Sequence, residues 1–161
     1  PEMVKVQSQG NRWNVTGLMR GEFEILSPTL GQQVYLQECD AGELTISTKC
    51  TALCIDASTG TSVACQSVIS AVQIVNCAHL RVECGGTGTQ SFQIDQTRGC
   101  RVVIRHPGPT EVKMYLDGVT ELQVEKDDSV EVSYYRMSEE GLWVDDEEHG
   151  QASLLLTKAA R

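Results

Sequence analysis

Aspartate and histidine are the side chains in this sequence that could serve hydrolysis or metal binding. Asp56 and Asp95 occupy equivalent positions two turns apart in an internal repeat, and strands stacked at about 4.8 Å would hold them about 10 Å apart. This separation is too long for the paired carboxylates of a glycoside hydrolase. His79, His106 and His149 fall at different positions of the repeat, so they do not predict a shared zinc site.

Arginine and glycine offer candidates for nucleotide chemistry. Arg81, Arg98, Arg101 and Arg105 could each stabilise charge on a nucleotide that a partner hydrolyses. The segment 85–89, Gly-Gly-Thr-Gly-Thr, is glycine-rich like a phosphate-binding loop but lacks the Lys-Ser/Thr ending of that motif. We interpret this segment as a corner turn.

The seven cysteines form neither a disulfide framework nor the paired CxxC spacing of a zinc site. Cys50 and Cys54 lie four residues apart, but Cys54 should point outward while Cys50 lies near a corner. We therefore predict free thiols that pack as small hydrophobic side chains in a reducing cytosol. No metal and no other cofactor is expected.

The charge of the chain is negative and uneven. The formal net charge is −9, and residues 117–148 hold 12 of the 22 acidic residues against the basic Lys126 and Arg136. This composition lacks the basic stripe of a nucleic-acid-binding protein, and no run of about 18 apolar residues predicts a membrane span. The acidic balance favours a basic or mixed-charge protein partner.

The clearest signal in the sequence is an internal repeat of apolar residues. Its first series has steps of 19, 19, 19, 20 and 20 residues and consists of Val15, Val34, Leu53, Val72, Phe92 and Val112. The second series has the same steps and consists of Ile25, Leu44, Val63, Val82, Val102 and Leu122. Most members are followed two residues later by another apolar residue, a spacing that places both side chains on one face of a strand.

Two short strands in each period, without a helical insert, are typical of a parallel β-helix. We predict an all-β protein in which residues 1–126 form about six coils of 19–20 residues. Small side chains recur where a corner would turn inward, at Cys39, Ser58, Cys77 and Thr97. A third, shorter strand is expected around 49–50 and 68–69.

The repeat fades after Val124, and residues 127–161 are predicted to form a tail outside its register. This tail contains three strand-like stretches, and the open edge of a solenoid needs a cover. The tail could cover the edge of its own chain, or it could exchange with a second copy and build a two-fold homodimer. The residues expected at the dimer contact are Tyr134, Tyr135, Leu142, Trp143, Leu154 and Leu156.

Three strings in the coils resemble the C-terminal domain of cyclase-associated protein. They are 33–39 (Gln-Val-Tyr-Leu-Gln-Glu-Cys), 72–77 (Val-Gln-Ile-Val-Asn-Cys) and 92–100 (Phe-Gln-Ile-Asp-Gln-Thr-Arg-Gly-Cys). The likeness covers roughly residues 15–125 and includes the lengths of the coils. The same superfamily contains the tubulin-folding cofactor C domain.

The resemblance implies a right-handed parallel β-helix with a C-terminal strand-exchange hairpin, in a cytoplasmic, cytoskeleton-associated binding protein that is not an enzyme. Such a domain would bind monomeric actin, prefer the ADP form and promote nucleotide exchange, thereby regulating filament turnover. Outward positions of the first strand series and of the following turn supply the expected actin contacts, which are Gln73, Val75, Gln93, Asp95, Arg98, Lys113 and Tyr115.

The sequence departs from the family at two places. Gln96 and Arg98 replace the usual Lys and Asp of one family string, and residues 134–142 contain no clear counterpart of the family's Pro-Glu-Gln segment. Two alternatives also stay open. A GTPase regulator of the cofactor C type would use one arginine as a finger, for which 79–81 is the nearest match, and a carbohydrate-active β-helix is the third possibility.

Overall fold

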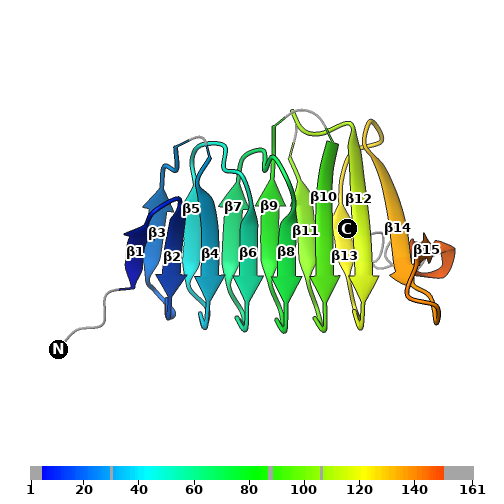
Figure 1. Ribbon diagram of the computed structural model, residues 1–161, viewed down its shortest axis with the longest axis horizontal. Coiled ribbons are helices and arrows are strands. Elements are labelled where there is room, and N and C mark those ends of the chain that lie inside the picture. The colour runs from blue at the N-terminus through cyan, green and yellow to red at the C-terminus, as the bar shows by residue number, and fades with distance from the viewer. Residues whose placement is uncertain (1–4, 30, 87–88, 106, 151–161) are drawn as a thin grey trace.

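The computed structural model describes residues 5–29, 31–86, 89–105 and 107–150. In these ranges, strands stack into two facing sheets along the length of the molecule (Figure 1). Successive strands alternate between the two sheets over most of the chain, so each coil contributes one strand to each sheet. This arrangement is a β-solenoid, and it confirms the fold class that the repeat predicts.

The larger sheet has nine strands, in the order β1 (Val6–Gln9), β2 (Arg12–Thr16), β4 (Gln33–Gln37), β6 (Leu53–Asp56), β8 (Val72–Val75), β10 (Thr89–Asp95), β12 (Glu111–Asp117), β14 (Glu131–Met137) and β15 (Trp143–Asp145). The smaller has six, in the order β13 (Gln123–Glu125), β11 (Arg101–Ile104), β9 (Arg81–Cys84), β7 (Ser62–Cys65), β5 (Glu43–Ile46) and β3 (Phe23–Leu26). All neighbouring strands are parallel except β1 with β2 and β14 with β15.

The core is built from columns of apolar side chains that point inward from both sheets. In the nine-stranded sheet, alternate residues such as Ile55, Ile74 and Ile94 stack directly on one another and are all 0% exposed. In the six-stranded sheet, Val63 stacks on Val82 in the same way. Burying these side chains removes apolar surface from water, which is the main favourable term that holds the coils together.

The predicted register of the first strand series is correct in the middle coils and wrong at both ends. Val34, Leu53, Val72 and Phe92 stack as predicted. Val15 instead stacks on Leu36, which makes the first step 21 residues long, and Phe92 stacks on Met114, a step of 22 residues. The extra residues lie in the corners 27–32 and 105–110, which contain proline and glycine and belong to no strand.

The second series is wrong at its ends for the same reason. Ile25 stacks on Thr45 and is 62% exposed, while Val102 stacks on Val124 and not on Leu122. The predicted end of the repeat at Val124 is also wrong, because β14 adds another parallel strand to the nine-stranded sheet. β15 then folds back antiparallel on β14, so residues 131–145 form a hairpin at the end of the stack (Figure 1).

The corner after each strand of the nine-stranded sheet is formed by a residue in the left-handed region. Glu38, Ala57, Asn76 and Gln96 have φ between 48° and 54°. Each costs roughly 1–2 kcal/mol for a non-glycine residue, but each backbone N–H donates a hydrogen bond to a carbonyl of the next coil. The predicted inward corner residues are confirmed as 2–4% exposed, and Ser58 Oγ accepts a bond from the Cys39 N–H at 3.2 Å.

The expected third strand is present only as an isolated bridge between Cys50 and Val68. A more regular series of bridges, which the sequence did not suggest, runs through the corner just described and joins Asp40, Thr59, Ala78, Arg98 and Thr120. Across the part of the chain that the structure describes, no helix combines the length and apolar character needed to cross a membrane.

Candidate partner-binding face

The outward side of the nine-stranded sheet brings several predicted site residues together. Gln73, Gln93 and Tyr115 stack in one column, since β8, β10 and β12 are paired in register. Val75 and Asp95 stack in the adjacent outward column. These five residues lie on three neighbouring strands, and we call them the central patch. The sequence placed them on one face, and the strand pairing makes them neighbours.

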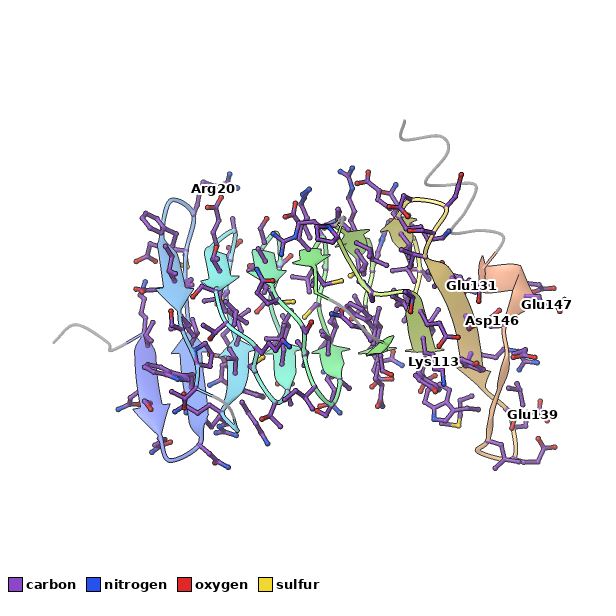
Figure 2. All side chains as sticks on the ribbon, turned by 90° about the horizontal axis from the view of Figure 1, so that it is seen from above. Arg20, Lys113, Glu131, Glu139, Asp146 and Glu147 are labelled. Carbon is purple, nitrogen blue, oxygen red and sulfur yellow. The ribbon has the colours of Figure 1, made fainter. Side chains whose placement is uncertain are left out.

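The two other predicted actin contacts lie at the border of the central patch. Lys113 points to the same side as Tyr115, two residues earlier on β12, and stacks on Ser91 (Figure 2). Arg98 lies in the corner ladder, and its Nε is 3.3 Å from Glu121 Oε2 with both side chains largely exposed. An exposed ion pair of this kind contributes little to stability, so Arg98 is free to exchange Glu121 for another anionic group.

A carboxylate pair that the sequence did not reveal lies next to the central patch. Asp95 and Asp117 stack on neighbouring strands. Partial burial of Asp95, together with the adjacent charge of Asp117, raises the pKa of the Asp95 carboxyl above its usual value. Asp117 was missed because its proximity depends on the 22-residue step between Phe92 and Met114. The pair gives this part of the face a negative charge.

Asp56 and Asp95 are separated by one strand, as predicted, and Asp56 has a structural contact of its own. The Tyr35 hydroxyl donates a hydrogen bond of 2.7 Å to Asp56 Oδ2. This bond, with some burial, raises the pKa of Tyr35 to about 12. The Arg12 guanidinium lies 5.1 Å from the centre of the Tyr35 ring. Asp56 is therefore part of a local network, and it does not pair with Asp95.

Aromatic side chains gather at the C-terminal end of the same face. The Tyr115 and Tyr135 rings are stacked with their centres 4.9 Å apart. The Trp143 ring meets Tyr115 edge-on at 5.2 Å. The sequence analysis assigned Tyr115 to partner contact and the other two residues to the dimer contact. The structure brings all three into one aromatic cluster.

Comparisons with known proteins agree with this architecture. The family described as adenylate cyclase associated (CAP) C terminal matches residues 2–134. The chain belongs to this family. It is 27% identical over 135 residues to an adenylyl cyclase-associated protein of Dictyostelium discoideum and 29% identical over 105 residues to cyclase-associated protein 1 of Arabidopsis thaliana. These matches cover 78% and 65% of this chain but only 28% and 22% of those proteins.

A solved structure shares the fold of this family member. The crystal structure of cyclase-associated protein from Cryptosporidium parvum superposes with a TM-score of 0.72 at 17% sequence identity. The match covers 91% of this chain and 96% of that one. At this identity the likeness establishes the fold alone. The resemblance noted from the three sequence strings is confirmed by both comparisons.

The predicted dimer residues of this CAP-family chain lie in several environments. Tyr135 and Trp143 belong to the aromatic cluster, whereas Tyr134 points inward from β14, where it stacks on Met114. Leu142, in the turn before β15, is 65% exposed. Leu154 and Leu156 lie outside the described residues. The structure of one chain therefore does not bring these six residues into a single contact.

The candidate arginine fingers on the six-stranded sheet are engaged in contacts within the chain. Arg81 pairs with Glu83, and Arg101 pairs with Glu125. Arg105 donates a hydrogen bond of 2.8 Å to the Cys65 carbonyl. No group of three or more potential metal ligands gathers among the residues that the structure describes. Gly85 and Gly86 lie in the corner after β9, as the corner-turn interpretation expects.

All seven cysteines are free. Six are buried, and Cys54 is half-buried on the outward side of β6, as predicted. Burial raises the pKa of Cys84 and of Cys100 to about 12. Cys65 and Cys84 stack as neighbours inside the solenoid. These thiols are poor nucleophiles because they stay protonated at neutral pH, so they act as packing residues.

Proposed function

We propose that this chain binds monomeric actin through the central patch, Lys113 and Arg98, and that it is a binding module without catalytic activity of its own. Membership of the cyclase-associated protein family supports this proposal. The observation that carries it is the continuous outward block of Gln73, Gln93 and Tyr115, bordered by Val75. Tyrosine and apolar side chains on an otherwise polar face are typical of the energetic centre of an interface.

The proposed action on actin is a coupling of two binding equilibria. The chain would bind the ADP form of actin more tightly and would favour an actin conformation that releases nucleotide. Coupling of this kind requires contacts that differ between the two states of actin, and no covalent chemistry. The protein would thereby recycle actin monomers, in the cytoplasm and in association with the cytoskeleton.

We further propose that residues 127–161 exchange between two copies to form a homodimer. The hairpin of β14 and β15 is the last unit of the nine-stranded sheet and follows the polar segment 126–129. A second copy could donate the same hairpin to β12 with the same register. Exchange would then replace Tyr135 and Trp143 beside Tyr115 by their equivalents from the other copy, so each aromatic cluster would include residues of both chains.

Release of a fluorescent nucleotide from actin monomers tests the binding proposal. Joint substitution of Gln93, Asp95 and Lys113 by alanine should weaken actin binding and slow this release without unfolding the chain. A matched control replaces Thr45 and Gln123, which point outward from the six-stranded sheet, by alanine and should behave like the wild type. Unchanged affinity of the triple variant would move the binding site away from the central patch.

A further inference from the structure

The C-terminal end of the solenoid is open on its inner side. β14 extends the nine-stranded sheet past β12, whereas the described strands of the six-stranded sheet end at β13 in the preceding coil. Val132 and Tyr134 continue the columns of Val112 and Met114. They are only partly buried, although Val112 and Met114 are 1% and 0% exposed. The apolar columns therefore end beside an open space.

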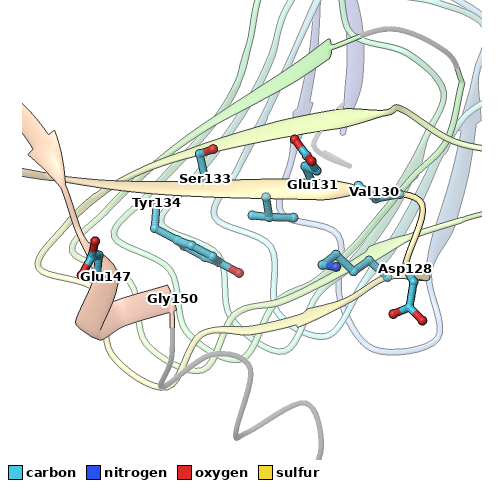
Figure 3. A pocket seen from close by; sticks show the side chains of 9 residues that line it. Asp128, Val130, Glu131, Ser133, Tyr134, Glu147 and Gly150 are labelled. Carbon is cyan, nitrogen blue, oxygen red and sulfur yellow. The ribbon is translucent and has the colours of Figure 1, made fainter.

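A hollow of about 620 Å³ lies against this inner side (Figure 3). All of its lining residues come from 126–150, and Val130, Val132 and Tyr134 form its apolar part. The carboxylates of Asp128, Glu131 and Glu147 also line it. Its size falls within the range of about 300–1,000 Å³ that is typical of sites for small ligands. We call it the end hollow.

The chain itself leads into the end hollow. The Asp146 N–H donates a hydrogen bond of 2.8 Å to the Tyr134 carbonyl, and a helical turn at 147–150 follows. His149 holds its ring 6.3 Å from the Tyr134 ring. A side chain at Gly150 would begin only 2.9 Å from that ring, so the backbone passes directly against it (Figure 3). Residue 151 therefore starts at the mouth of the hollow.

The sequence that follows matches the chemistry of the end hollow. Residues 151–161 read Gln-Ala-Ser-Leu-Leu-Leu-Thr-Lys-Ala-Ala-Arg, with three consecutive leucines, two basic residues and no acidic residue. The leucines suit the apolar lining, and Lys158 and Arg161 are opposite in charge to its carboxylates. Figure 2 shows Glu131, Asp146 and Glu147 together at this end of the molecule. Four to six extended residues reach about 13–20 Å, which is enough to cross the hollow.

We propose that Leu154, Leu155 and Leu156 of the same chain fill the end hollow and close the solenoid. The tail is attached to Gly150 at the mouth of the hollow, so its effective concentration there is about millimolar. A second copy at micromolar concentration cannot compete with that. Because every lining residue belongs to 126–150, the closure moves with the hairpin if the hairpin exchanges. The inference is therefore independent of the proposed dimer and of actin binding.

The test uses full-length variants. Replacing Leu154, Leu155 and Leu156 by serine should lower the melting temperature by about 5 °C or more, because apolar burial is lost. A control that replaces Gln151 and Thr157 by serine should melt like the wild type. A fluorescent peptide of residues 151–161 should bind the triple-serine variant, whose hollow is empty, and should not bind the wild type. The same peptide with serine at the three leucines should bind neither protein.

Three results would overturn the proposal. The first is a triple-serine variant that melts like the wild type. The second is additivity, because Val132→Ala should shift the melting temperature less in the triple-serine variant than in the wild type if the leucines contact Val132. The third is a triple-serine effect that changes with protein concentration, which would assign the hollow to the tail of a second copy.

Discussion

Ile74 offers the most direct test of the solenoid register. Its side chain is 0% exposed and is stacked between Ile55 and Ile94, which are also 0% exposed. Truncation of a buried isoleucine to alanine costs about 2–5 kcal/mol, more where the surroundings cannot collapse. The neighbouring strands are held by ladders on both sides, so we expect about 3–4 kcal/mol for Ile74→Ala. Its melting temperature should fall by roughly 6–16 °C.

Urea denaturation followed by circular dichroism measures this loss, and the adjacent residue provides the control. Gln73 is exposed on the opposite side of β8, so Gln73→Asp should change the free energy of unfolding by no more than about 1 kcal/mol. Ile74→Asp would bury an unpaired charge and should prevent folding. If Ile74→Asp and Gln73→Asp fold equally well, or if Ile74→Ala costs less than about 1 kcal/mol, the register is wrong.

Three further predictions concern the thiols, alkaline stability and the C-terminal segment. Thiol titration of the denatured protein without reductant should count seven free cysteines, and a count of five or fewer would contradict the assignment; in the native protein, the half-buried Cys54 should react first. Stability should be unaffected by the thiols below pH 9 and should fall between pH 9 and about 12, because unfolded thiols ionise there while Cys84 and Cys100, with pKa raised by burial to about 12, stay protonated. Equal unfolding midpoints in urea at pH 8 and pH 10.5 would argue against that burial. Deleting residues 127–161 should give a monomer that melts earlier or aggregates, whereas light scattering on the intact chain should give about twice 17.6 kDa; a mass near 17.6 kDa would end the dimer proposal.

The sequence predicted the fold class and the middle of the solenoid because the signal there is strictly local. Leu53, Val72 and Phe92 lie in coils whose corners have nearly constant length, so equal spacing in sequence corresponds to stacking in space. At the ends, Trp13 and Met114 stand in the columns where Val15 and Val112 were expected. A corner can gain two residues without disturbing either flanking strand, and no apolar pattern within a corner records that gain.

β14 illustrates a second limit of the sequence pattern. Val132 and Tyr134 alternate as an inward pair should, and they do stack on Val112 and Met114. The pattern was set aside because the polar segment 126–129 interrupts it and because Val112 itself had been assigned to the wrong column. An error of two residues in one coil therefore displaced the expected position of the next, and β14 was interpreted as a tail.

The candidate face depends on coil length more strongly than the core does. Apolar core columns tolerate a shift of two residues, since position i+2 is also apolar in most coils and the buried pattern looks the same. The outward columns contain different residue types at i and i+2, so the same shift changes which side chains meet. With a step of 20 residues, Gln93 would stack on Lys113 and Asp95 on Tyr115. The observed step of 22 residues instead places Tyr115 beside Gln93 and Asp117 beside Asp95. Two residues in a proline-containing corner thus decide that the central patch joins the aromatic cluster, and only the structure establishes that contact.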